Sequence, residues 1–202
     1  MKWSGRSAIA IAIAGVCAAV TMFSGTAQAS PIWEPLQPVA NLDVARYVGE
    51  WNQVAAIPQP FSLACAKDTR ASYGIVDSSN VSVKNTCTTW TGQANEIVGN
   101  ARVTDPATGA QLHVSFPGVP SQESLDGPPN YIVTYIADDY SWALVGDPLR
   151  LSGFVLSRSA VVDAAGWSEI RRVAESRGYN ACTILTSPTT EGTSDIRPLC
   201  TV

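Results

Sequence analysis

Between residues 51 and 158 the sequence repeats one arrangement, a short segment rich in β-branched and aromatic residues followed by a turn rich in Asp, Asn, Pro or Gly. Segments of this kind predict β-strands. No helical segment separates them, so each strand should pair with the next in an antiparallel meander. We expect eight strands, at residues 51–57, 67–76, 81–91, 96–104, 111–116, 131–136, 140–146 and 154–158.

An open meander exposes the edges of its first and last strands, and closure into a barrel removes both edges. One amphipathic helix follows the strands: Asp163 can cap it, Trp167 and Ile170 share its apolar face, and Gly178 ends it. A last short strand is expected at residues 182–185. The sequence therefore predicts an all-β fold, an eight-stranded antiparallel up-and-down β-barrel with one C-terminal α-helix.

Residues 1–29 have the features of a secretory signal peptide: two basic residues near the start, an apolar run at 8–20, and an Ala-Gln-Ala sequence that ends at Ala29. The apolar run is shorter than the roughly 20 residues that span a bilayer. Cys17 follows a valine rather than a small residue, which argues against lipid attachment there. We expect cleavage after Ala29 and a secreted, cell-envelope or periplasmic location.

Three parts should follow the signal peptide. Residues 30–42 contain several prolines and predict an extended N-terminal arm. Residues 43–186 should form the barrel domain with its helix, and residues 187–202 a polar tail. The expected tail contains Cys200, so a disulfide would tie it back to the domain.

Four cysteines remain after the signal peptide, Cys65, Cys87, Cys182 and Cys200. An even number in an exported chain predicts two disulfides, with three possible connectivities. We favour Cys65–Cys87 and Cys182–Cys200, because each bridge would join neighbouring segments. A zinc site is disfavoured, since no two of these cysteines have the close spacing that zinc sites use.

The charge balance excludes one class of partner. The chain has 13 Lys and Arg against 17 Asp and Glu, a net charge of −4, without a basic cluster. Proteins that bind nucleic acid usually carry a basic patch. We therefore expect no nucleic-acid partner. The sequence predicts no cofactor and no metal, leaves contact with a membrane open without an anchor, and does not determine the oligomeric state.

Three motifs in order resemble those of the lipocalin family, in particular bacterial members similar to apolipoprotein D. They are Gly49-Glu50-Trp51, residues 140–148 (Tyr-Ser-Trp-Ala-Leu-Val-Gly-Asp-Pro) and residues 154–158 (Phe-Val-Leu-Ser-Arg). The resemblance implies that Gly49, Trp51, Tyr140 and Arg158 form a structural motif in which the Arg158 guanidinium stacks on Trp51 at the closed end of the barrel. One departure is Ala137, which occupies the place of a family aspartate, while Asp138 comes one residue later.

The resemblance also implies a ligand cavity lined by alternate residues of the strands. Alternation at residues 111–116 and the next strand gives the candidate ligand-binding residues Leu112, Val114, Phe116, Tyr131, Val133 and Tyr135. The opposite face of the second strand, Ile132, Thr134 and Ile136, is nearly as apolar, so its register stays open. Three further aromatic side chains should lie near the mouth or outside the barrel, Phe61, Trp90 and Trp142.

The function that the resemblance implies is binding and transport or storage of a small hydrophobic molecule, such as a fatty acid or lysophospholipid. Two alternatives stay open, an enzyme acting on a lipid-like substrate on the same barrel and a ligand-free envelope or inhibitor domain.

Catalytic residues are not predicted. The one histidine, His113, falls on the face opposite Leu112 and Phe116, and we expect it to be solvated. The loop carboxylates Glu123, Asp126, Asp138 and Asp139 are typical turn formers. With every mature cysteine paired, no thiol nucleophile remains. We therefore expect a protein that is not an enzyme.

Overall fold

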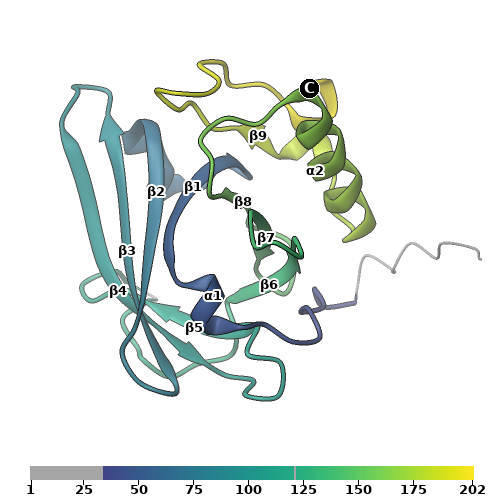
Figure 1. The fold of residues 1–202 in the computed structure, drawn as a ribbon. Helices are drawn as coiled ribbons and strands as arrows, with labels where there is room; N and C mark the ends of the chain where they lie inside the picture. The colour runs from purple at the N-terminus through teal and green to yellow at the C-terminus, as the bar shows by residue number, and fades with distance from the viewer. Residues whose placement is uncertain (1–33, 121) are drawn as a thin grey trace, which may run out of the picture.

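A computed structural model describes residues 34–120 and 122–202, so the expected signal peptide and its cleavage site lie outside the described residues. Eight consecutive strands form the centre of the molecule (Figure 1). They are β1 (Gly49–Ala56), β2 (Cys65–Ile75), β3 (Asn80–Thr89), β4 (Ala94–Val103), β5 (Gln111–Ser115), β6 (Tyr131–Ile136), β7 (Trp142–Gly146) and β8 (Gly153–Ser157).

Each strand pairs antiparallel with the next, and β1 closes the sheet into a barrel. Residues 49–52 of β1 pair with β2, and residues 52–56 pair with β8. Asn52 lies opposite Arg70 of β2 and also opposite Ser157 of β8, so it marks the crossing point. The predicted closed eight-stranded antiparallel barrel is confirmed.

Two helices accompany the barrel. The first, α1 (Val44–Tyr47), begins at Asp43, whose carboxylate accepts a hydrogen bond from the Arg46 backbone N–H. The second, α2 (Ala164–Ser176), begins at Asp163, whose carboxylate caps the helix in the same way. Within the described part of the chain, no helix is long and apolar enough to cross a membrane.

The C-terminal segment differs from the expected single strand at residues 182–185. Cys182 lies in a 3-10 turn, η2 (Ala181–Thr183), and the strand β9 (Leu185–Thr186) begins later and pairs with β1. Two other 3-10 turns are η1 (Pro60–Ala64) and η3 (Leu199–Thr201). The tail is held by packing in addition to the expected disulfide, because Leu199 is fully buried.

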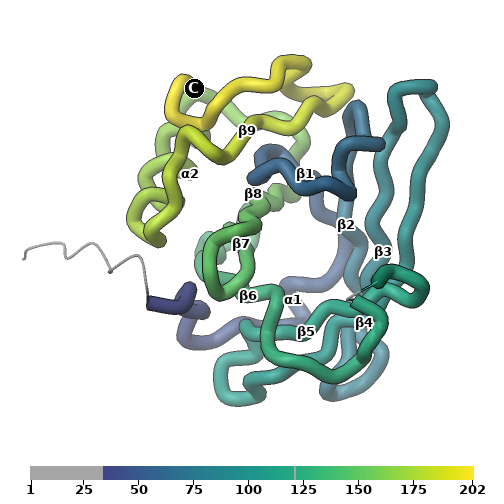
Figure 2. Tube along the Cα trace, turned by 180° about the vertical axis from the view of Figure 1, so that it is seen from behind, coloured from purple at the N-terminus to yellow at the C-terminus, as the bar shows by residue number. Residues whose placement is uncertain are grey.

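One wall of the barrel, made by β6, β7, β8 and residues 52–56 of β1, is covered on its outer face. Figures 1 and 2 both show α2 and the C-terminal segment on this side. We call it the covered wall, since both of its faces are buried. Its outer face and the layer above it share one apolar cluster, which includes Leu36, Val54, Ile132, Leu144, Val155, Ile170, Val173, Ile184 and Leu199.

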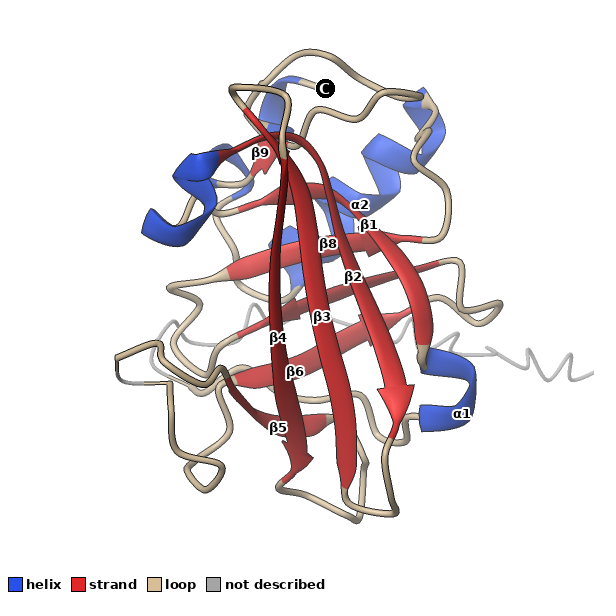
Figure 3. Ribbon diagram, turned by 90° about the vertical axis from the view of Figure 1, so that its left-hand side faces the viewer, coloured by secondary structure: helices blue, strands red, loops and turns tan. Residues whose placement is uncertain are grey.

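The opposite wall consists of the long strands β2, β3 and β4, which stand in front of the barrel in Figure 3. We call it the bare wall, because its outer face meets solvent. Val98 on β4 is 56% exposed, whereas Val83 on the inner face of β3 is 2% exposed. Side chains along a strand point to opposite faces in turn, so these strands are apolar on the inside and mixed on the outside.

Both expected disulfides are present. Cys65–Cys87 joins β2 to β3 at one end of the bare wall. Cys182–Cys200 joins η2 to η3 and holds the C-terminal tail against the covered wall.

Candidate functional site: the barrel cavity

The barrel encloses a cavity of about 590 Å³, within the size range of small-molecule sites. Its floor is made by Leu42, Val44, Tyr47 and Val48, at the end where α1 enters β1. Its rim comes from the connections at residues 57–64, 116–130 and 147–152. The cavity therefore runs along the barrel axis from a closed end to an open mouth.

The side walls of the cavity are mainly apolar. Alternate residues of the bare wall supply small aliphatic side chains, and the other strands supply larger ones. Gly99 on β4 makes room for Phe116, because a Cβ at this position would lie 2.5 Å from the Phe116 ring. The apolar lining includes Ala71, Val81, Val83, Ala101, Leu112, Val114, Phe116, Val145, Phe154 and Leu156.

Four of the six candidate ligand-binding residues line this cavity, namely Leu112, Val114, Phe116 and Tyr131. The other two do not. Val133 is fully buried in the core at the closed end, where Trp51 and Val145 belong to the same cluster. Tyr135 lies outside the barrel, with its ring centroid 4.5 Å from that of Trp142 and its hydroxyl 3.4 Å from Glu169 of α2.

A register shift in β6 explains the position of Tyr135. The pairing with β7 slips between Val133 and Tyr135, so Tyr135 lies opposite Leu144. An irregularity of this kind adds a residue and changes which face the following side chains occupy. Ile132, which precedes the shift, packs outside in the covered cluster. Ile136, which follows the shift, packs against the closed-end cluster.

The closed end is sealed by Arg158 and Trp51. The Arg158 guanidinium carbon lies 3.6 Å from the centroid of the indole ring, which is the contact that the resemblance implied. Its nitrogens donate to the carbonyls of Arg46, Tyr47, Val48 and Glu50 at 2.7–3.1 Å.

Two neighbouring residues complete this seal. Gly49 has a φ of +100°, which favours glycine, and a Cβ there would lie 3.3 Å from Arg158 Nη1. The Tyr140 hydroxyl accepts a hydrogen bond from the Asp43 N–H at 2.9 Å, and Arg46 lies over the Tyr140 ring. Ligand access is therefore confined to the other end of the barrel.

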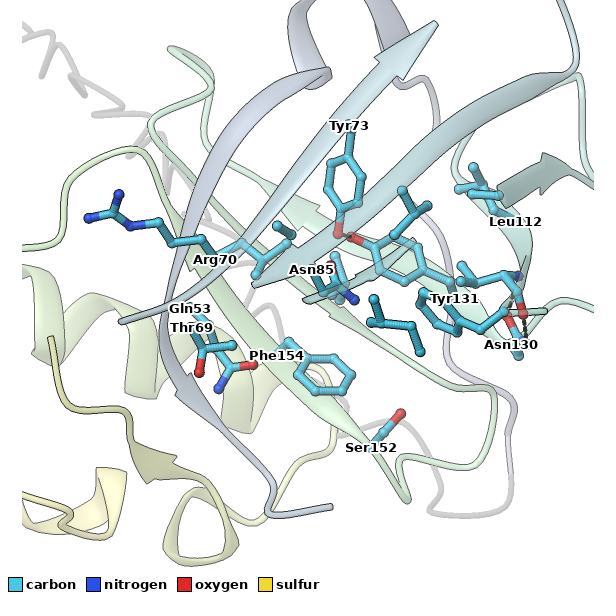
Figure 4. Close-up of a pocket in the computed structure, with 18 of the residues that line it drawn as sticks. Gln53, Thr69, Arg70, Tyr73, Asn85, Leu112, Asn130, Tyr131, Ser152 and Phe154 are labelled. Atoms are coloured by element: carbon cyan, nitrogen blue, oxygen red, sulfur yellow. Dashed lines mark hydrogen bonds between the residues drawn. The ribbon is translucent and has the colours of Figure 1, made fainter. Parts of the chain in front are cut away.

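Three tyrosines provide polar atoms at the cavity floor. The Tyr131 hydroxyl lies 2.6 Å from that of Tyr47 and 3.1 Å from that of Tyr73. Figure 4 shows Tyr73 and Tyr131 with their hydroxyls turned toward each other. Burial raises the pKa of Tyr73 to about 12 and those of Tyr47 and Tyr131 well above the usual value. All three are therefore neutral phenols at physiological pH.

Two cavity residues, Tyr47 and Tyr73, were not predicted from the sequence. Tyr73 lies two residues after Ala71 on the same strand, and both side chains point inward, so the alternation along the strand could have predicted the orientation of Tyr73. Tyr47 offered no such signal, because it precedes the barrel and reaches the cavity through α1.

The expectation that His113 is solvated is wrong. The side chain faces away from the cavity, but the 116–130 connection folds back over it and leaves it 9% exposed. Its Nδ1 lies 2.8 Å from the Pro128 carbonyl oxygen and its Nε2 lies 3.1 Å from the Ser124 carbonyl oxygen. A Cβ on Gly127 would lie 2.3 Å from the ring, so only glycine fits there. His113 thus holds the loop against β5.

Two of the loop carboxylates make contacts that hold loops or turns, and two of the aromatic side chains lie near the mouth. Asp126 forms an ion pair with Arg102, and Asp139 accepts a hydrogen bond from the Ser141 N–H in a turn. Phe61 is exposed at the mouth, and the indole N–H of the exposed Trp90 donates to the Leu63 carbonyl. Among residues 34–120 and 122–202, no group of three or more His, Cys, Asp or Glu side chains is placed to hold a metal ion.

Comparison with known proteins agrees with this geometry. A family model described as a lipocalin-like domain matches residues 42–189. Temperature-induced lipocalin-1 of Arabidopsis thaliana is 32% identical over 155 residues, covering 76% of this chain and 82% of the plant protein. The outer membrane lipoprotein Blc of Vibrio cholerae is 27% identical over 149 residues, covering 73% of this chain and 82% of that protein.

Among solved structures, insecticyanin from the tobacco hornworm Manduca sexta superimposes with a TM-score of 0.61 at 17% identity, covering 77% of this chain and 85% of that one. At this identity the likeness shows the fold alone. The family match spans the whole barrel, the helix α2 and the start of the tail. This chain therefore belongs to the lipocalin family.

Proposed function

We propose that this protein binds a small hydrophobic molecule in the barrel cavity and transports or stores it. The observation that carries the proposal is the cavity itself, about 590 Å³ and lined mainly by aliphatic and aromatic side chains. Lipocalins bind small hydrophobic ligands, and a fatty acid, a lysophospholipid or a similar molecule has the matching chemistry. Leu112, Val114, Phe116 and Tyr131 are the predicted lining residues that would contact it.

The driving force is removal of apolar surface from water, about 25 cal/mol for each Å² buried. The inner face of the bare wall supplies much of this surface. Lipocalins are in general binding and transport proteins, and we propose that this chain also acts by binding rather than by catalysis.

The proposed location is outside the cytoplasm, secreted or in the cell envelope. Two disulfides support it, because such bonds form and persist in oxidising compartments.

A direct test is native mass spectrometry and lipid extraction of the protein purified from its own host, followed by displacement of a fluorescent naphthylamine dye by added lipids. Bound apolar molecules and dye displacement are expected. Val83→Phe, on the inner face of β3, should weaken lipid binding at least about tenfold by filling the cavity.

The matched control is Val98→Phe, on the solvent face of β4, which should bind as the wild type does. A wild-type protein that is empty as purified and does not bind the dye or any lipid would contradict the proposed function.

A further inference from the structure

The cavity floor differs from its side walls in having three hydroxyl groups in mutual contact. Tyr47 at the end of α1, Tyr73 on β2 and Tyr131 at the start of β6 come from three separate segments. The rings of Tyr47 and Tyr73 stack with centroids 5.7 Å apart, and Tyr131 meets Tyr73 edge-on at 6.3 Å. We call these residues the tyrosine cluster. Their rings fix the hydroxyls in place before any ligand arrives.

The tyrosine cluster has one more hydroxyl hydrogen than its mutual hydrogen bonds use. Three hydroxyls carry three hydrogens, and their two mutual hydrogen bonds use two of them. Whichever way the two bonds point, one O–H remains, together with unused lone pairs. Among the described residues, these hydroxyls have no other hydrogen-bond partner. A buried polar hydrogen normally finds a partner, and the open side of the cluster is the cavity.

The tyrosine cluster carries no charge that could pair with a charged ligand. Each phenol is neutral, and Arg158, the cation that acts on Tyr47, lies against Trp51 with its nitrogens donating to four backbone carbonyls. An ionised carboxylate on the floor would lose its hydration without gaining a counter-ion, which is strongly unfavourable. A neutral oxygen loses much less hydration free energy, and it can accept a hydrogen bond from the unused O–H.

The polar residues of the rim are at the other end. Gln59, Gln122 and Asp147, from the three rim connections, line the cavity there, where it opens to solvent. An ionised head group can therefore stay hydrated at the mouth, while a neutral polar group is accommodated at the floor. This arrangement favours ligands that enter with a neutral oxygen first.

We propose that the tyrosine cluster is an anchor for a neutral hydroxyl or carbonyl oxygen at the inner end of an otherwise apolar ligand, such as a long-chain alcohol or ketone. The inference rests on the proposed function, since it requires that the cavity is the ligand site. It adds a preferred ligand class and an orientation to that function.

The test compares the wild type with the triple variant Tyr47→Phe/Tyr73→Phe/Tyr131→Phe. Removing all three hydroxyls together leaves no unpaired partner, so the fold should be retained. Tyr135→Phe is the matched control, because this tyrosine is on β6 as well but lies outside the barrel. Dodecan-1-ol, dodecan-2-one, dodecane and ionised dodecanoate at pH 8 would each be assayed by displacement of the naphthylamine dye.

The triple variant should bind dodecan-1-ol and dodecan-2-one about three- to tenfold more weakly than the wild type, which corresponds to one lost hydrogen bond. Its affinity for dodecane and dodecanoate should stay unchanged, and Tyr135→Phe should change none of the four. An equal loss for all four ligands, or no loss for any, overturns the anchor while the cavity remains the ligand site. A wild type that binds none of the ligands overturns the proposed function and the anchor together.

A spectroscopic measurement on the wild type keeps the inference testable if the triple variant does not fold. The carbonyl stretch of bound, ¹³C-labelled dodecan-2-one should lie at lower frequency than in an alkane solvent, because the anchor donates to it. A frequency equal to that in alkane would overturn the anchor.

Discussion

The covered wall and the bare wall perform different tasks with strands of the same barrel. The covered wall has short strands of 5–6 residues in β6, β7 and β8, buried on both faces. The bare wall has strands of 10–11 residues, buried on one face only. Most of the stability of the barrel should therefore reside in the covered wall, while the bare wall provides the long inner surface of the cavity.

The largest contrast between the walls should appear when an apolar side chain on the outer face of each wall is truncated. Leu144→Ala on β7 removes a fully buried side chain from the covered cluster, and we expect it to lower the free energy of unfolding by about 4 kcal/mol. Val98→Ala on the solvent face of the bare wall should change it by less than about 0.5 kcal/mol. Urea unfolding measures both, and equal effects would contradict the division between the walls.

The second test uses pH, because Tyr73 on the bare wall and Tyr131 on β6 meet through their hydroxyls. Burial raises the pKa of Tyr73 to about 12, whereas an unfolded tyrosine titrates near 10. The unfolded state therefore loses this proton first as the pH rises. The stability associated with the neutral phenol is fully present below about pH 10 and is lost progressively toward pH 12.

The expected loss from Tyr73 alone is about 2.3 kcal/mol by pH 12. Urea unfolding between pH 8 and 11.5 measures it, and Tyr73→Phe is the control that should reduce the slope. The interpretation fails if the variant and the wild type lose stability in parallel.

The smallest expected effect concerns the seal where β1 passes from one wall to the other. Arg158→Lys keeps the charge but loses the planar group that covers Trp51 and donates to four carbonyls. We expect a loss of about 2 kcal/mol, seen as a lower melting temperature, with unchanged dye affinity in the cavity.

Arg172→Lys is the matched control for Arg158→Lys, since Arg172 is largely exposed on α2 and should tolerate the change. A melting temperature that stays the same in both variants would show that the seal does not stabilise the barrel.

The difference between the walls also explains which predictions from sequence succeeded. The strands of the bare wall were placed within two residues of β2, β3 and β4, because one buried face and one solvated face produce a visible alternation. In β6 both faces are buried, so Ile132 and Val133 look alike in the sequence. The register shift beyond Val133 then placed Tyr135 outside, which alternation alone could not reveal.

Other features of the site depend on contacts between distant segments. His113 is buried by a loop that returns to it from residues 124–128, and no local pattern predicts that return. The tyrosine cluster requires three segments to meet, so neither its composition nor its position follows from any one strand. By contrast, Trp51 and Arg158 could be predicted, because their motifs resemble those of a known family.

The double pairing of β1 has a consequence for how the chain reaches its native state. Asn52 and Ser157, which are adjacent where the barrel closes, are 105 residues apart in sequence. Loops of this length make closure slow compared with the formation of neighbouring hairpins. During synthesis β1 can pair with β2 early, but its other edge has no partner until β8 has been made, so closure comes late. In the interval one side of the barrel is open, and the cavity is enclosed only when β1 meets β8.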